Sequence, residues 1–214
     1  MQIHRLVFSP IEINTYILAD DDNKCAIIDC GCYTAEEFRR FTDFLEQKKL
    51  EPVLLLNTHC HLDHIFGNGR FLEKYNIGPY CHRLDEINRK NAVKQAMFFG
   101  LRMEEPPDPA GYIDDGQTIF FGPVEIKALH VPGHSPGSLA YYFEKEDIVF
   151  TGDALFANSI GRTDLPGGDY NTLINSIRTK LFTLPAETVV YPGHYGTTTI
   201  GEEMKSNPYF IKNQ

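Results

Sequence analysis

Four side chains that can bind a metal ion lie within a stretch of six residues. His59, His61, Asp63 and His64 follow the aliphatic run 53–56. Imidazole nitrogens and carboxylate oxygens are ligands for zinc, and also for iron or manganese. Polar residues also gather in ordinary turns, but this group follows a predicted strand and precedes a predicted helix, which favours a metal site.

Three more candidate ligands lie in the second half of the chain, and each follows an apolar run. The runs 124–131 and 188–191 both end in Pro-Gly-His, at His134 and His194, and the run 148–151 ends in Gly-Asp, at Asp153. Strand ends on one edge of a sheet converge, and the loops there carry chemistry on a rigid support. We therefore expect the seven side chains to form one site, and the repeated Pro-Gly-His suggests two similar halves.

The local backbone must aim these side chains. Along an extended chain His59 and His61 point the same way, so both can bind one ion, while Cys60 points back toward the packed layer. Glycines 133 and 193 would allow a tight turn before each later histidine. The three remaining histidines (His4, His82 and His130) are interpreted as ordinary surface or packing residues.

Hydrophobic patterning predicts a single domain over 1–214 that mixes strands and helices. The run 53–56 has the continuous apolar character of a central strand buried on both faces. Thr34 and Glu37 form a capping box ahead of a helix that ends near 49, and Asp63 occupies an N-cap position. The other predicted elements are strands at 3–8, 15–19, 25–29, 79–81, 118–120, 124–131, 139–143, 148–151 and 188–191, and helices at 63–75, partly at 85–103, and at 171–181.

The segment 97–101, Met-Phe-Phe-Gly-Leu, is an apolar cluster next to the proline-rich stretch 104–109. A lid, a substrate wall, a subunit contact and the end of a core-packing helix all agree with this pattern. The sequence does not separate these interpretations.

Composition excludes several classes of protein. The formal net charge of −9 argues against binding to nucleic acid, which needs a basic face. No run of 18 apolar residues and no signal-peptide core are visible, so we expect no membrane partner and a cytoplasmic location. Five cysteines are an odd number, which favours reduced thiols over a disulfide scaffold. The oligomeric state is not predicted.

The motifs together resemble those of the metallo-β-lactamase-fold hydrolases. The resemblance implies an α+β fold, an αββα four-layer sandwich of two mixed β-sheets flanked by helices. It also implies that His59, His61 and His134 bind one metal ion, that Asp63, His64 and His194 bind a second, and that Asp153 bridges the two. The residues that carry it are Thr58-His59-Cys60-His61-Leu62-Asp63-His64, Gly133-His134-Ser135, Gly152-Asp153 and Gly193-His194.

Within that superfamily the segments 161–169 and 192–203 look like the compact glyoxalase II-like branch. We therefore expect two divalent ions, zinc in the first place, and a small-molecule thioester as substrate. Two ions about 3.5 to 4 Å apart can share a water, lower its pKa and polarise a carbonyl. The hypothesis is thioester hydrolysis by a hydroxide that bridges the ions. Only 20 of the 214 residues follow His194, so the helical region that helps to hold glutathione in glyoxalase II is not expected.

Three residues receive further roles in this hypothesis. Asp63 serves as a ligand and as the catalytic proton acceptor. Arg162 is a candidate to bind a substrate carboxylate, although a structural pair with Asp164 or Asp169 explains it equally well. Tyr195, next to a ligand, is a candidate for the substrate pocket.

Two alternatives stay open. A related branch of the fold uses one iron to oxidise glutathione persulfide, and the Gly161-Arg162-Thr163-Asp164 segment occurs there too. A non-catalytic metal-binding protein is the other alternative, and it predicts closed coordination without an exchangeable water.

Overall fold

The computed structural model describes residues 1–211, which fold into two compact units. Among these residues the first unit comprises 1–113 with 120–124, and the second comprises 114–119 with 125–211. Each unit is built on a sheet with both parallel and antiparallel strand pairs, and helices pack on each sheet.

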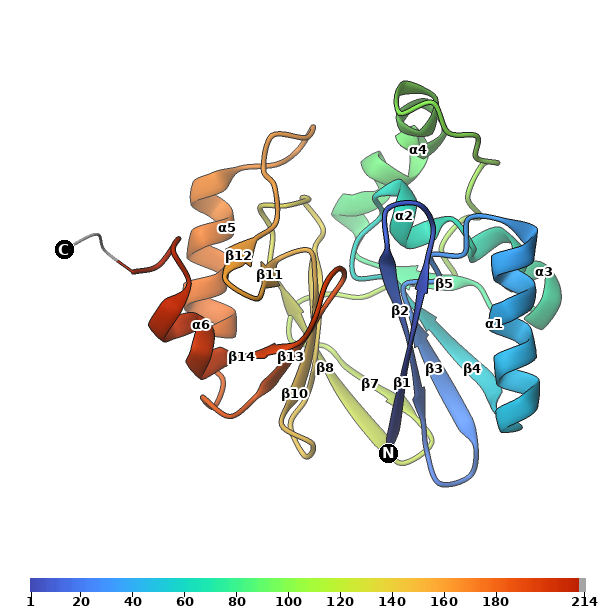
Figure 1. Ribbon diagram of the computed structural model, residues 1–214, viewed down its shortest axis with the longest axis horizontal. Helices are drawn as coiled ribbons and strands as arrows, with labels where there is room; N and C mark the ends of the chain where they lie inside the picture. The colour runs from blue at the N-terminus through green and yellow to red at the C-terminus, as the bar shows by residue number, and fades with distance from the viewer. Residues whose placement is uncertain (212–214) are drawn as a thin grey trace. The chain divides into compact units, whose positions relative to one another are not determined.

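The first unit contains a six-stranded sheet in the order β1-β2-β3-β4-β5-β6 (Figure 1). The first three strands are antiparallel, and β3, β4, β5 and β6 run parallel. The prediction of a central strand at 53–56 is confirmed by the interior place of β4. The bounds are β1 Gln2–Phe8, β2 Ile13–Ala19, β3 Lys24–Ile28, β4 Glu51–Leu56, β5 Pro79–Cys81 and β6 Gly111–Tyr112.

Helices α1 (Ala35–Lys48) and α3 (Asn68–Tyr75) pack on this sheet. The capping box at Thr34 and Glu37 is present as predicted. Behind it, Phe41 and Leu45 of α1 and Phe71 of α3 form a buried cluster with apolar residues of β2, β3 and β4. A short 3-10 turn η1 (Arg83–Asp85) leads into α4 (Glu86–Phe98).

Two predictions for the ligand segment are wrong in detail. The helix predicted at 63–75 is divided into α2 (Leu62–Ile65) and α3, because the chain turns at Gly67, whose N–H donates to the Cys30 carbonyl at 2.8 Å. A Cβ at Gly67 would lie 2.5 Å from Cys30 Sγ. The N-cap of α2 is His61, and Asp63 lies inside the helix.

Strand β4 is also less buried than its apolar sequence predicts. Leu55 and Leu56 are fully buried, but the Val53 side chain is 37% exposed. Only the end of the strand that leads to the histidines is therefore enclosed on both faces.

The second unit contains a six-stranded sheet in the order β14-β13-β10-β9-β8-β7. Strands β10 and β13 are parallel, whereas β9 is antiparallel to both of its neighbours. A small hairpin, β11 (Leu155–Phe156) and β12 (Ser159–Ile160), follows β10. The remaining bounds are β7 Thr118–Phe121, β8 Val124–His130, β9 Leu139–Phe143, β10 Ile148–Gly152, β13 Val189–Pro192 and β14 Thr198–Thr199.

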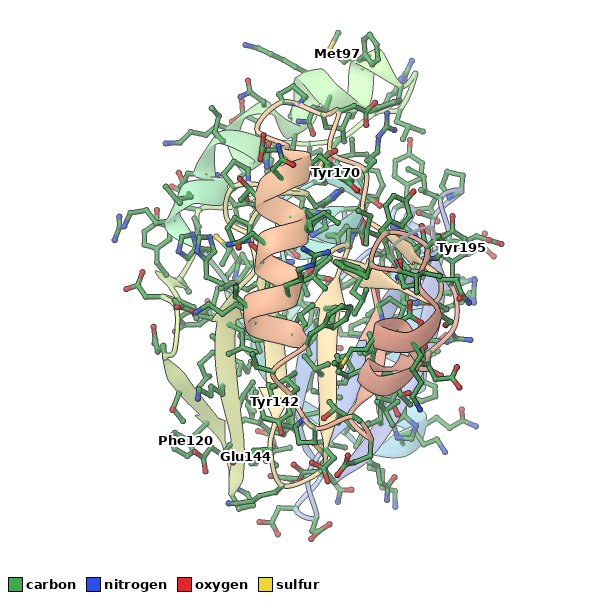
Figure 2. The ribbon with its side chains drawn as sticks, turned by 90° about the vertical axis from the view of Figure 1, so that its left-hand side faces the viewer. Met97, Phe120, Tyr142, Glu144, Tyr170 and Tyr195 are labelled. Atoms are coloured by element: carbon green, nitrogen blue, oxygen red, sulfur yellow. The ribbon has the colours of Figure 1, made fainter. Side chains whose placement is uncertain are left out.

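Helices α5 (Tyr170–Ser176) and α6 (Ile200–Ser206) pack against this second sheet (Figure 2). A π-helical turn η2 (Ile177–Leu181) continues α5, so the predicted helix at 171–181 is confirmed in extent. Leu173, Ile177 and Leu181 pack on apolar residues of β8, β9, β10 and β13.

The apolar cluster at 97–101 is not the end of a core-packing helix. Met97 is 71% exposed, Phe98 85% and Phe99 49%, and Met97 lies at the outer end of α4 (Figure 2). The proline-rich stretch beside it is held by Arg89, whose guanidinium donates to the Pro106 carbonyl at 3.1 Å and pairs with Asp108 at 2.8 Å.

No helix among residues 1–211 is both long enough and apolar enough to cross a bilayer. All five cysteines are buried free thiols, as the odd number predicts, and Cys60 faces the core.

Candidate metal centre

The first unit brings His59, His61, Asp63 and His64 together. The rings of His59 and His61 lie 4.7 Å apart between centroids, and those of His59 and His64 lie 3.9 Å apart. His64 Nε2 lies 3.7 Å from Asp63 Oδ2. All four residues are at most 9% exposed, so three imidazoles and a carboxylate are concentrated in a small buried volume.

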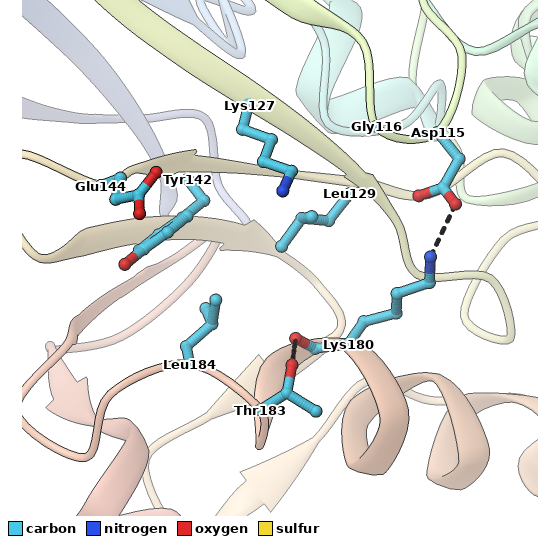
Figure 3. A pocket seen from close by; sticks show the side chains of 9 residues that line it. All are labelled: Asp115, Gly116, Lys127, Leu129, Tyr142, Glu144, Lys180, Thr183 and Leu184. Atoms are coloured by element: carbon cyan, nitrogen blue, oxygen red, sulfur yellow. Dashed lines mark hydrogen bonds and ion pairs between the residues drawn. The ribbon is translucent and has the colours of Figure 1, made fainter.

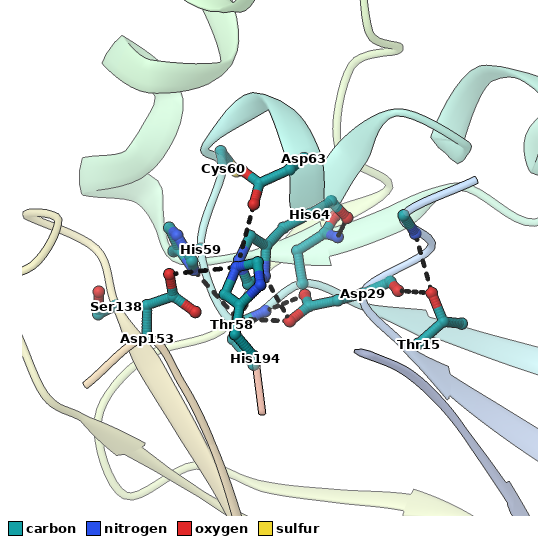
Figure 4. Close-up of polar contacts among 12 residues, drawn as sticks. Thr15, Asp29, Thr58, His59, Cys60, Asp63, His64, Ser138, Asp153 and His194 are labelled. Carbon is teal, nitrogen blue, oxygen red and sulfur yellow. Dashed lines mark hydrogen bonds and ion pairs between the residues drawn. The ribbon is translucent and has the colours of Figure 1, made fainter. Parts of the chain in front are cut away.

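Asp29 orients one of these ligands and was not predicted. Its Oδ2 lies 2.8 Å from His64 Nδ1 (Figure 4). A carboxylate is an acceptor, so Nδ1 donates and Nε2 is left as the metal-binding nitrogen. The same carboxylate accepts from the Thr58 N–H at 2.8 Å and the Thr58 hydroxyl at 2.6 Å. Asp29 directly follows the apolar run of β3, so the rule that identified the other ligands also applies to it.

The second unit places Asp153 between two histidines. Its Oδ2 lies 3.6 Å from His134 Nε2. The same oxygen lies 3.6 Å from His194 Nε2 (Figure 4). Both distances are longer than a direct N–H···O hydrogen bond. One carboxylate oxygen that faces two imidazole nitrogens is the arrangement expected of an acid that bridges two cations.

Backbone geometry aims His134. Gly133 has φ +129°, a conformation that favours glycine, and a Cβ there would collide with Leu173 at the start of α5. His134 Nδ1 lies 2.8 Å from the Arg162 carbonyl and must donate to it, which leaves Nε2 for a metal ion. Position 161 needs a glycine for the Asp153 carbonyl to lie where it does, because a Cβ there would collide with that carbonyl.

Gly193, unlike Gly133, is not among the glycines with positive φ. Its N–H instead donates to the Gly152 carbonyl at 2.8 Å. Tyr195 takes the left-handed conformation two residues later, with φ +64°. The two Pro-Gly-His segments therefore turn differently.

The donor set of both units fits divalent metal ions. Buried imidazoles with one nitrogen occupied by a protein acceptor, next to carboxylates, are the ligands that zinc, iron and manganese take in proteins. Cysteine is not part of the set: the Cys60 thiol turns away into a cluster with Ile65, Cys81 and Ala92.

The two candidate substrate contacts lie in the second unit. Arg162 forms a two-pronged ion pair with Asp164, both distances being 2.7 Å, and both side chains are more than half exposed. The Asp164 carboxylate raises the pKa of the Arg162 guanidinium. Tyr195 is 72% exposed, and its ring lies 5.8 Å from that of Phe156. A role for either residue in substrate binding stays a prediction.

The second unit also contains a pocket of about 370 Å³ that none of the predicted site residues line (Figure 3). Lys180 at its edge is neutralised by Asp115 at 2.6 Å. The lining residues are Asp115, Gly116, Lys127, Leu129, Tyr142, Glu144, Lys180, Thr183 and Leu184.

Comparison with known proteins identifies the family. The sequence profile described as "Metallo-beta-lactamase superfamily" matches residues 9–194. The chain is 38% identical to the probable metallo-hydrolase YqgX of Bacillus subtilis (strain 168) over 214 residues, which cover 98% of this chain and 97% of that protein.

Two further relatives carry different activities in their names. The hydroxyacylglutathione hydrolase GloC of Haemophilus influenzae is 34% identical over 98% of each chain. The mitochondrial persulfide dioxygenase ETHE1 of Homo sapiens is 31% identical over 95% of this chain and 74% of that protein.

Solved structures of related sequence have the same fold as this chain. BLEG-1, described as a B3 metallo-beta-lactamase, superposes with a TM-score of 0.89 at 32% identity over 99% of this chain and 100% of that one. TTHA1623 in a di-iron-bound form gives a TM-score of 0.87 at 34% identity, over 96% and 99% of the two chains. The chain therefore belongs to the metallo-β-lactamase superfamily and has its fold, two mixed sheets flanked by helices.

Proposed function

We propose that the seven predicted ligands form one centre for two divalent metal ions, and that the chain is a thioester hydrolase of the hydroxyacylglutathione hydrolase type. The observation that carries the proposal is Asp153 Oδ2, which faces His134 and His194 at equal distances of 3.6 Å. A single carboxylate oxygen that faces two imidazole nitrogens supports a carboxylate shared between two ions. The similarity to GloC over 98% of each chain supports the reaction type.

The ligands divide between the ions as follows. His59, His61 and His134 bind the first ion, and Asp63, His64 and His194 bind the second, with Asp153 shared. The set proposed for each ion includes side chains from both compact units, so the assignment also requires that the chain acts as one domain over 1–214.

When bound, the two ions would supply a water of lowered pKa and polarise the thioester carbonyl. Asp63 would accept the proton of that water while the water oxygen forms a bond to the acyl carbon. The carbon–sulfur bond then breaks and the sulfur leaves with the electron pair. A thiol has an ordinary pKa of about 8.5, so the leaving thiolate needs little help from a general acid.

Arg162 is the proposed contact for a carboxylate of the thiol part of the substrate. Its guanidinium is exposed and already holds the carboxylate of Asp164 in two-pronged geometry, and a substrate carboxylate would replace that partner. Tyr195, also exposed, is proposed to line the same approach.

Zinc is the proposed resident metal, with iron or manganese as alternatives, since the ligand set accepts all three. The di-iron form of TTHA1623, at 34% identity, gives iron specific support. We keep the cytoplasmic location as a prediction from the sequence.

A persulfide dioxygenase is the second candidate, because ETHE1 is 31% identical over 95% of this chain. The two activities differ in their need for oxygen. Thiol release from a panel of acyl-glutathione thioesters under nitrogen tests the first, and oxygen consumption with glutathione persulfide tests the second. Thioester turnover without oxygen is the expected result, and oxygen-dependent persulfide turnover with no thiol release would contradict the proposal.

A further inference from the structure

One oxygen of the Asp85 carboxylate accepts from the Asn88 side chain of α4 at 3.4 Å, and the other accepts from an amide in a different segment of the chain. Asp85 is fully buried and occupies the N-cap position of α4, where an aspartate ordinarily accepts from an amide of the first helical turn. Asp85 makes no such capping bond. Its Oδ2 accepts instead from the N–H of Cys60, 25 residues earlier, at 2.5 Å. Burial of a carboxylate costs free energy unless the carboxylate is hydrogen-bonded, so the bond from the Cys60 N–H stabilises the buried Asp85 side chain.

The amide that Asp85 binds lies between two proposed metal ligands. Residues 57–61 have no regular secondary structure, so their amides need partners outside a helix or a sheet. The Thr58 N–H donates to Asp29 Oδ1 at 2.8 Å, and the Cys60 N–H donates to Asp85. His59 therefore lies between two amides that are each bound by a buried carboxylate.

Side-chain packing connects the same loop to α4. Cys60 packs with Ile65, Cys81 and Ala92, and Ala92 is a buried residue of α4. Cys60 is a free thiol that is only 2% exposed, and a buried thiol packs as a small apolar group. The loop and the start of α4 thus form one packed piece of the first unit.

We propose that Asp85 is a positioning residue for the metal centre: its carboxylate fixes the backbone at Cys60, so that His59 and His61 keep the separation that one ion requires. The inference rests on the two-metal centre proposed above. Asp29 holds the Thr58 amide on the other side of His59 and also orients His64, a ligand proposed for the second ion. Asp85 is bound to the Cys60 amide, next to His59 and His61, so its loss should weaken mainly the first ion, and this asymmetry can be measured.

The test compares Asp85→Ser with Asp85→Asn in the full chain. Serine is a favoured N-cap and preserves the start of α4, but its side chain is too short to reach Cys60. Asparagine keeps an acceptor oxygen at the same reach. The two dissociation constants for Zn²⁺ are measured by competition with a chromophoric chelator, and the visible spectrum of the Co²⁺-loaded protein reports ligand geometry.

Asp85→Ser should weaken the binding of one Zn²⁺ ion by roughly 10- to 100-fold, as loss of groups that orient ligands typically does. The dissociation constant of the other ion should stay nearly unchanged. The Co²⁺ spectrum of Asp85→Ser should change, and Asp85→Asn should restore both constants. Equal weakening of both ions, or two wild-type constants in Asp85→Ser, would overturn the proposal.

Asp20→Ser is the matched control. Asp20 is another buried aspartate of the same unit, and its Oδ1 accepts from the Asp22 and Lys24 amides at 2.9 Å, in the turn between β2 and β3. This variant should lose stability without a change in either dissociation constant. If it weakens metal binding as Asp85→Ser does, the effect of Asp85 is general destabilisation and the proposal fails.

One measurement needs no variant. In the metal-free wild-type protein the Cys60 amide should be strongly protected from hydrogen exchange, and free exchange there would contradict the proposal even if Asp85→Ser does not fold. The outcome for the enzymatic proposal is separate: two bound ions without thioester turnover refute the activity and leave Asp85 in place, whereas a wild-type chain that binds no metal refutes both.

Discussion

At the scale of single residues, two histidines each donate a hydrogen bond from one ring N–H to a protein acceptor. His64 Nδ1 donates to Asp29 and His134 Nδ1 donates to the Arg162 carbonyl. In both rings the tautomer is therefore set before any ion arrives, and Nε2 is the nitrogen that remains. Such contacts typically change metal affinity 10- to 100-fold.

Asp153→Ala should remove the shared ligand and lower the metal content of the purified protein from two ions per chain toward one or none. Thioester turnover should fall by about 10²-fold or more, in line with the loss of one ion of a two-metal centre. Elemental analysis and steady-state kinetics on the same sample check this. Metal content and turnover that both stay at the wild-type level would show that Asp153 is not a bridging ligand.

At the scale of elements, the turn that joins β8 to His134 depends on one glycine. Gly133→Ala would force a residue with a side chain into φ +129° and drive its Cβ into Leu173 of α5. We expect a loss of more than about 1 kcal/mol in the free energy of unfolding, together with weaker metal binding. Gly69→Ala in α3, where a Cβ meets nothing within 4 Å, is the control, and chemical denaturation is the measurement.

The start of α4 contains an ion pair with a predictable pH dependence. The hydrogen bond from Arg89 lowers the pKa of Glu86 to about 2. Because the folded-state pKa lies below the ordinary value of about 4.3, the stabilisation is complete above that ordinary value and is lost as the pH falls toward about 2.

Glu86→Gln should therefore be less stable than the wild type at pH 7, and the difference should shrink between about pH 4.3 and pH 2. Arg89 also holds the Pro106 carbonyl, so the variant should make the stretch 104–109 more sensitive to proteolysis. Urea midpoints across this pH range test the prediction, which a pH-independent difference would contradict.

The sequence predicts elements well where a strong local pattern decides them. The capping box at Thr34 and the turn of β2 into β3 are local, and both are confirmed. The N-cap predicted at Asp63 is wrong, because α2 begins at Leu62 and its N-cap is His61, two residues earlier. Strands of two residues, such as β11 and β12, carry no periodicity that a sequence could reveal.

The candidate site divides in the same way. The seven proposed ligands follow apolar runs, a pattern that is visible in the sequence, and Asp29 satisfies the same rule. Asp85 and the Arg162 carbonyl could not be predicted, because one acts on an amide 25 residues away and the other acts through the backbone.

At the scale of the whole molecule, each compact unit supplies part of the proposed ligand set, four side chains from the first and three from the second. If one centre uses all seven, metal binding and folding of the whole chain are coupled. Removal of the ions with a chelator should lower the unfolding temperature of the chain as a whole, and free Zn²⁺ at about 100 times its dissociation constant should restore about 2.7 kcal/mol. Differential scanning calorimetry checks this, and an unchanged transition in the chelated protein would contradict a shared centre.

The fixed tautomers of His64 and His134 have a consequence for which metal the protein binds. With each ring offering Nε2, the donor set suits zinc, iron and manganese, and selection among such ions in the cell rests on metal availability as well as on affinity. The supply in the growth medium then helps to decide the occupant. Protein produced in iron-rich and zinc-rich cultures should carry different metals on an identical scaffold.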